Sequence, residues 1–226
     1  MIKKWLEDIR VKTADMNRQE TCAYIITYYW YHILISVSVI ALIFMFAAHY
    51  IGNKETLFTC VMVNQAENTE RDELLKETFS EKSGLPQDQI VVDSGYMFSF
   101  GDVRFSEVNE SSYEKFFLQW RNQELDAVIL SESFYQHCKE MGGRFRNLQE
   151  MDTEGLECYT DDGQKTAIFL GKDSFSEKAL GDSDEKLLLA FPSSGKHEEE
   201  CQTFIDYLKA VKAGEIGGMS FEKIIN

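Results

Sequence analysis

The stretch YIITYYWYHILISVSVIALIFMFAAHY, residues 24–50, contains no Asp, Glu, Lys or Arg and decides how the chain is organised. From Ile33 to Ala48 only two serines interrupt the apolar run, and aromatic residues flank it on both sides. A helix rises about 1.5 Å per residue, so the stretch supplies the roughly 20 residues needed to cross an apolar slab of ~30 Å. Aromatic flanks are typical of the two headgroup interfaces. The sequence therefore predicts a transmembrane helix over residues 21–50; a buried helix of a soluble domain is the alternative.

Basic residues near this span predict its orientation. Five Lys or Arg residues precede it, whereas only Lys54 follows it before Arg71. The positive-inside rule then places residues 1–20 in the cytoplasm and residues 51–226 outside the cell membrane. A cleaved signal peptide is the competing interpretation. The long polar leading segment and the long apolar region favour an uncleaved signal-anchor instead.

The leading segment has a helical pattern of its own. Ile2, Trp5, Leu6 and Ile9 recur at the spacing of one helix face, with charged residues between them. We expect a short amphipathic helix over residues 1–20 that lies in the cytoplasmic interface. A docking helix for a partner protein is the alternative.

Charge excludes one class of partner. The chain has 23 basic and 38 acidic residues, a formal net charge of −15. Such an acidic outer domain will not hold a nucleic-acid backbone, which needs a basic surface. Four of the five cysteines follow the span, and Cys138 with Cys158 is the pair we would expect if any disulfide exists.

Hydrophobic patterns after residue 51 alternate between short strands and helices. Strands are expected near residues 56–63, 90–92, 126–130, 166–170 and 187–191. Helices are expected after Thr69, with Asp72 as a cap, after Ser111 in a capping box with Glu114, after Ser131 or Ser133, and around residues 201–211. This order predicts an α/β domain with a mainly parallel sheet flanked by helices.

Two segments resemble a known family. Leu125–Tyr135, continuing to Gly142, Phe145 and Leu148, resembles a strand-to-helix stretch of extracellular solute-binding proteins of the periplasmic-binding type II class. The run from Lys186 to Leu208, with its FIDYL sequence, is similar to their strand, loop and helix near the C-terminus. The resemblance implies a solute-binding-like domain. The short interval from Leu148 to Thr166 implies a reduced form that lacks the second of the family's two lobes.

Polar residues that follow the expected strands are the candidate ligand-binding set. In open α/β sheets ligands bind beyond the carboxyl ends of the strands, where helix N-termini offer N–H groups. The candidates are Asn64, Gln65, Ser94, Ser131, Glu132, Ser193 and Ser194. The same residue types are also needed as turn formers and helix caps.

The sequence contains no recognisable catalytic motif. Its four histidines are scattered, and neither a metal-binding spacing, a phosphate loop nor a dinucleotide fingerprint is present. We therefore expect no catalytic residues, no metal and no cofactor, although an enzyme of unrecognised type stays an alternative.

Two functions fit these observations. The first is an accessory subunit of a membrane complex, which we expect to be a transporter, whose outer domain contacts an integral membrane protein such as a permease. The second is a module that recognises a small molecule or peptide. Absence of a second lobe favours the first.

Overall fold

The computed structural model describes residues 10–14, 16–52, 54–106, 108–173 and 184–225, together with Glu7 and Phe175 as single positions. The chain divides into two compact units, residues 1–54 and residues 55–226. The expected amphipathic pattern of Ile2, Trp5, Leu6 and Ile9 lies outside the described residues.

The first unit is dominated by one long helix, α2, which spans Arg18–Gly52. A reciprocal capping box begins it, because Asn17 Oδ1 accepts from Glu20 N at 2.9 Å and Glu20 Oε2 accepts from Asn17 N at 3.0 Å. From Arg18 to Ala48 this helix is long and apolar enough to cross a membrane. The helix α2 includes the whole span predicted over residues 21–50 and begins three residues before it.

The second unit is built on one six-stranded sheet with the order β2-β1-β3-β6-β5-β4. The strands are β1 (Phe58–Val63), β2 (Ile90–Tyr96), β3 (Ala127–Ser131), β4 (Cys158–Asp161), β5 (Gln164–Lys172) and β6 (Lys186–Ala190). β2, β1 and β3 are parallel, whereas β6 is antiparallel to both β3 and β5, and β4 is antiparallel to β5. The α/β class is thus confirmed, but the prediction of a mainly parallel sheet is wrong.

The hairpin of β4 and β5 provides one of the three antiparallel pairings in the sheet. β4 and β5 are joined by a tight turn in which Asp162 and Gly163 have φ of 48° and 78°. Antiparallel strands can be joined by such a turn, while parallel ones need a long crossover. The sequence indicates the turn at residues 161–163, but β4 is only four residues long and was not predicted. β6 then continues antiparallel to β5, where Asp173 N donates to Glu185 O at 2.8 Å.

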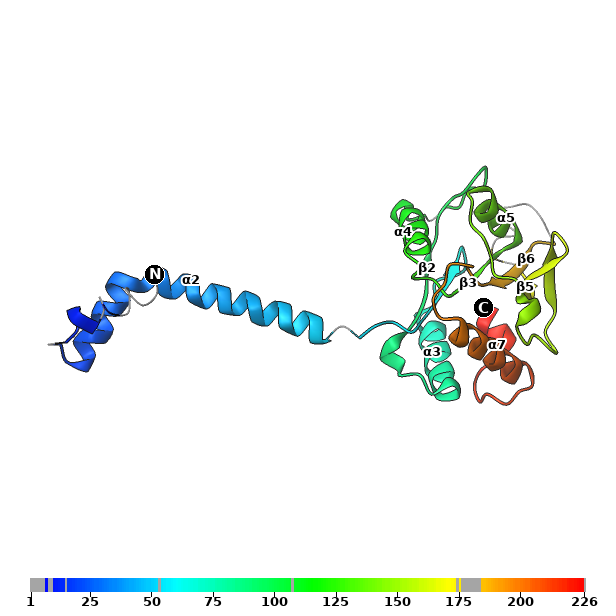
Figure 1. Cartoon of the computed structure of the whole chain (residues 1–226). Helices are drawn as coiled ribbons and strands as arrows, with labels where there is room; N and C mark the ends of the chain where they lie inside the picture. Colours follow the sequence, from blue (N-terminus) through cyan, green and yellow to red (C-terminus); the bar gives the residue numbers. More distant parts are fainter. Residues whose placement is uncertain are drawn as a thin grey trace. The chain divides into compact units, whose positions relative to one another are not determined.

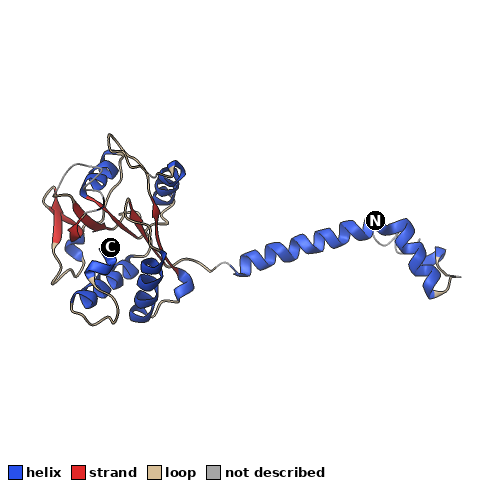
Figure 2. Ribbon diagram, turned by 180° about the vertical axis from the view of Figure 1, so that it is seen from behind, coloured by secondary structure: helices blue, strands red, loops and turns tan. Residues whose placement is uncertain are grey.

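Helices cover both faces of the sheet (Figures 1 and 2). On one face lie α3 (Thr69–Ser83), α7 (Glu198–Lys212) and the short α8 (Phe221–Ile225). On the other lie α4 (Glu110–Arg121) and α5 (Glu132–Glu140). The described part of this unit also has two single turns of 3-10 helix, η1 (Gln87–Gln89) and η2 (Leu148–Glu150).

The sheet separates two hydrophobic cores. Phe58 of β1 packs with Phe79 of α3 and Phe204 of α7 in the first core. Val61 of β1 packs in the second core, with Phe116 of α4 and Phe134 of α5. Every residue of β1 is buried, as in a strand that is covered on both faces.

Two of the predicted helix caps are wrong. Asn68 caps α3 by accepting from Arg71 N, so Asp72 does not serve as the cap. Asn109 caps α4 by accepting from Ser111 N, in place of the predicted box of Ser111 with Glu114. Ser131 caps α5 as predicted, accepting from Phe134 N.

All five cysteines are free thiols, so the expected Cys138–Cys158 pair is not formed. Cys60, Cys138 and Cys201 are buried, and burial raises the pKa of each thiol, that of Cys201 to about 12. Since the thiolate is the reactive form, buried thiols with raised pKa react slowly.

We expect iodoacetamide at pH 8 to modify Cys158 in the native protein but to leave Cys60, Cys138 and Cys201 unmodified until the chain is unfolded. Intact-mass and peptide mass spectrometry, with and without denaturant, measures this. Modification of Cys138 at the rate of Cys158 would contradict the packing described here.

Candidate functional site

The candidate residues divide between two opposite edges of the sheet. Because β1, β2 and β3 are parallel, their carboxyl ends meet at one edge, where Asn64, Gln65, Ser94 and Ser131 lie. β6 runs the other way, since its Leu187 pairs with Ser131. Ser193 and Ser194 follow β6 and therefore lie at the opposite edge. The prediction that all seven candidates gather at one edge is wrong for these two serines.

Asn64 and Gln65 fix the loop after β1. They are only 1% and 2% exposed. Asn64 adopts a left-handed backbone, with φ of 53°, and its Oδ1 accepts from Phe98 N at 2.9 Å. Gln65 Nε2 donates to Asp173 Oδ2 at 3.0 Å. These side chains join β1 to the segments that follow β2 and β5, and they do not face an open cleft.

Ser94 belongs to a buried polar cluster beside the start of α3. Its N and Oγ both donate to Asp72 Oδ2, at 2.9 and 2.6 Å, and its Oγ accepts from Asn68 N at 3.0 Å. Arg71 Nε lies 3.4 Å from Asp72 Oδ1, and its Nη2 donates to Ala66 O. The cluster ties β2 to the N-terminus of α3. Asp72 is thus used for a strand-to-helix contact, which explains why it does not cap the helix.

Replacing Ser94 with alanine is expected to lower the free energy of unfolding by about 1–2 kcal/mol, because the buried carboxylate of Asp72 loses a hydroxyl donor. Chemical denaturation of the wild type and the variant measures this. Ser99→Ala is the matched control, since Ser99 Oγ accepts a single bond, from Phe105 N at 3.2 Å, in a partly buried loop. Equal stability of all three proteins would contradict the role given to the cluster.

Ser131 and Glu132 occupy the junction of β3 and α5. Ser131 is 1% exposed and caps α5, while Glu132 forms an ion pair with Lys186 at 2.9 Å. The buried Glu185 accepts from both N and Oγ of Ser133, at 2.7 and 2.6 Å. Sequence reasoning selected neither Glu185 nor Asp173, because both lie just outside the expected strands.

The opposite edge contains an Asp–His pair that the sequence did not reveal. Asp126, 1% exposed, accepts from Thr59 N at 2.9 Å, and its two carboxylate oxygens lie 3.0 and 3.1 Å from His197 Nδ1. Burial raises the pKa of Asp126, while hydrogen bonds from His197 and Thr59 oppose that rise. The pair joins the beginnings of β1, β3 and α7. Seventy-one residues separate the two side chains in sequence, so no local motif indicates them.

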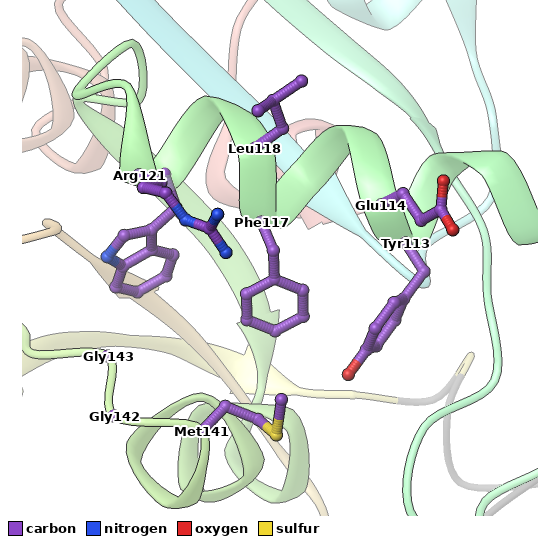
Figure 3. Close-up of a pocket in the computed structure, with 9 residues that line it drawn as sticks. Tyr113, Glu114, Phe117, Leu118, Arg121, Met141, Gly142 and Gly143 are labelled. Atoms are coloured by element: carbon purple, nitrogen blue, oxygen red, sulfur yellow. The ribbon is translucent and has the colours of Figure 1, made fainter.

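Three neighbouring hollows, which share some of their lining residues, lie on the surface along α4 and next to its N-cap Asn109. The first, of about 550 Å³, lies between α4 and the end of α5, and Figure 3 shows Tyr113 and Phe117 of α4 pointing toward Met141. The second, of about 640 Å³, shares Tyr113 and Glu114 with the first. The third, of about 790 Å³, shares Phe105 and Val108 with the second and reaches Ser94 at the carboxyl edge of the sheet. We call these hollows together the α4 trough.

The α4 trough differs in chemistry from the polar residues at the carboxyl ends of β1 and β3. Apart from Ser94, its lining includes none of the seven candidates. Its lining is rich in aromatic and aliphatic side chains: Met97, Phe98, Phe100, Phe105, Val108, Tyr113, Phe117, Leu118, Trp120 and Met141. Such a surface can bury apolar groups of a partner, whereas Asn64, Gln65 and Ser131 already bond within the domain.

Among the described residues, no group of three or more His, Cys, Asp or Glu side chains is arranged to hold a metal ion. Searches of protein-family models, curated proteins and solved structures found no match to this chain. Function must therefore be argued from these two surfaces and from the apolar helix.

Proposed function

We propose that this protein is a single-pass, membrane-anchored accessory subunit of a membrane complex, for example a transporter. In this proposal α2 crosses the cell membrane with the N-terminus in the cytoplasm, and residues 55–226 form an extracytoplasmic domain. The domain acts by contacting an integral membrane protein such as a permease, not by catalysis. It is too acidic to bind nucleic acid.

One contrast supports interaction over ligand capture. Asn64, Gln65 and Ser131 are each at most 2% exposed. Groups of this kind would have to face a cleft in order to bind a solute, yet here they bond to Phe98, Asp173 and Phe134. The aromatic α4 trough, by contrast, is open to solvent. Open apolar surface bordered by charged residues is typical of protein-interaction sites.

A ligand-recognising module is the second candidate function. The observation that favours it is the hollow of about 790 Å³ that Ser94, Ser106 and Asn109 line in part. This volume is in the range of small-molecule sites, and the hollow lies where open α/β sheets bind ligands. In this alternative the domain would sense or deliver a small molecule or peptide.

Two measurements on the full-length protein in mild detergent separate these functions. We expect chemical crosslinking and co-purification to recover an integral membrane protein, and we expect pools of amino acids, sugars or short peptides to leave Tm unchanged. Ligand at 100 times its Kd would stabilise the native state by about 2.7 kcal/mol, which raises Tm measurably. A rise in Tm with one pool, without any co-purifying membrane protein, would replace the first function by the second.

A further inference from the structure

The α4 trough has the features of a groove for a helix. α4 has 12 residues and is therefore about 18 Å long. Tyr113, Phe117 and Trp120 lie on it at i, i+4 and i+7, and the rings of Tyr113 and Phe117 are 4.8 Å apart. A row at this spacing is the ridge that the apolar face of a second helix packs against.

The end of α5 forms the other wall of the groove. Met141 there is 58% exposed, and its side chain lies opposite Phe117 (Figure 3). Gly143 lets the chain that follows α5 come close to Trp120, because a Cβ at that position would lie 2.8 Å from Cys138 O and 3.2 Å from the Trp120 ring. Leu118, 56% exposed, projects from α4 on the side away from Met141. The side chains of Leu118 and Met141 are thus exposed to solvent on the two sides of the groove.

Charge indicates which kind of helix fits. Residues 55–226 contain 17 Lys or Arg and 34 Asp or Glu, a net charge of −17. Glu110 and Glu114 line the trough beside its aromatic rings. Two arginines also line it: Arg104, which donates to the carbonyl oxygens of Gly101 and Val103, and Arg121, beside Phe117 in the first hollow (Figure 3). The negative charge that acts on a partner therefore comes mainly from the domain as a whole. A second copy of this acidic domain would be repelled, whereas a basic partner would be attracted.

We infer that the α4 trough binds a basic amphipathic helix of another protein, with apolar residues at i, i+3, i+4 and i+7 against Phe117, Trp120 and Met141. This inference rests on the proposed function and names the chemistry of the partner. Apolar contacts in the groove provide affinity, and the acidic groups of the domain provide steering and selectivity for Lys and Arg.

Trp120 offers a direct test. With Trp5→Phe and Trp30→Phe, the full-length chain in zwitterionic lipid nanodiscs retains Trp120 as its one fluorophore of this type. The probe is a 14-residue peptide of Leu and Lys with Leu at the helical spacing. Its controls are a scrambled peptide of the same composition and a Leu/Glu peptide of the same pattern. We expect saturable quenching or shift of Trp120 emission with the Leu/Lys helix alone, a signal that binding of the peptide to lipid would not produce.

Matched substitutions locate the contact. Met141→Ser and Leu118→Ser together are expected to weaken binding about 10-fold, whereas Val91→Thr, at an exposed position outside the trough, leaves it unchanged. Glu110→Gln with Glu114→Gln is expected to weaken it about 3-fold or more, a loss that Glu199→Gln with Glu200→Gln, in the first turn of α7, should not reproduce. Circular dichroism confirms that each variant is folded.

Three results would overturn the inference: no saturable Trp120 signal, equal binding of the Leu/Glu peptide, or equal losses in the control variants. Concentration-dependent dimerisation that Met141→Ser abolishes would also overturn it, by assigning the groove to a second copy. Failure of the peptide with continued co-purification of a membrane protein would reject this groove and leave the proposed function intact. Loss of co-purification alone would reject the proposed function.

Discussion

Replacing His197 with alanine is expected to lower the free energy of unfolding by about 3 kcal/mol at pH 7. The substitution removes a side-chain partner of the buried Asp126 carboxylate, and an uncompensated buried charge typically costs 3–5 kcal/mol. His197 is partly exposed, so water can replace some of the lost interaction, which places the effect at the lower end. Denaturant unfolding of the full-length protein in detergent, followed by Trp120 fluorescence, measures the change.

Asp126→Asn and the double variant complete a mutant cycle. We expect the two substitutions to be strongly non-additive, since they remove the same interaction. His137→Ala is a matched control, because the His137 ring contacts Phe134 and Tyr113 but its ion pair with Glu140 is at 4.0 Å on the surface. Additive effects of His197→Ala and Asp126→Asn would contradict a direct coupling.

The pKa of Asp126 predicts how this cycle changes with pH. Burial raises that pKa above the ordinary aspartate value of 3.8, so the folded state holds its proton at pH values where the unfolded chain has lost it. The contribution of Asp126 to stability is therefore fully present below about pH 3.8 and is lost as pH rises through the raised folded pKa. Comparing His197→Ala with His197→Ala plus Asp126→Asn isolates this group, because both proteins lack the imidazole. We expect the single variant to lose stability relative to the double variant as the pH rises from about 3.8 through the raised folded pKa of Asp126. The opposite slope would show that the pKa is lowered.

Much of the second unit could be predicted because its signals are local. β1 is apolar apart from Thr59, which is the pattern of a strand buried on both faces. α7 presents Cys201, Phe204, Ile205 and Leu208 on one face, which is the pattern of a helix buried on that face. Whether two strands run parallel or antiparallel cannot be predicted in this way, because it depends on which strands pair. The four-residue β4 pairs with β5 in a hairpin, and β4 has no strong hydrophobic signal of its own.

The candidate site shows a second limit of sequence reasoning. Asn64 and Ser94 are residue types that suit a ligand, and they are equally suited to hold a left-handed turn and to bond a buried carboxylate. Their type cannot distinguish these roles, because the partner atoms come from Phe98 and Asp72 across the fold. The aromatic residues of α4 recur at helical spacing in the sequence, yet their partial exposure depends on where the end of α5 stops. Local sequence therefore predicted the elements, and long-range packing decided which surface stayed open.

Replacing Val39 and Ile43 with arginine is expected to remove the protein from the membrane fraction. The two positions lie one helical turn apart near the middle of the apolar stretch, and each arginine at a bilayer centre costs about 2.5–3.5 kcal/mol. A combined cost of about 5–7 kcal/mol is comparable to the whole stability of a small domain. In alkaline carbonate extraction of cells, we expect the wild type in the pellet and the variant in the supernatant.

Cys22→Arg with Ile26→Arg is the control, because it places the same pair of charges, at the same spacing, toward the N-terminal end of α2, which the proposed topology places in the cytoplasm. Arginine there can extend its guanidinium to the headgroups, and its charge agrees with the positive-inside orientation, so this variant should stay in the pellet. If Val39→Arg with Ile43→Arg also stays there, lipid does not surround the middle of α2. The proposal of a membrane anchor would then fail, and the side chains exposed along this helix would need a protein partner instead.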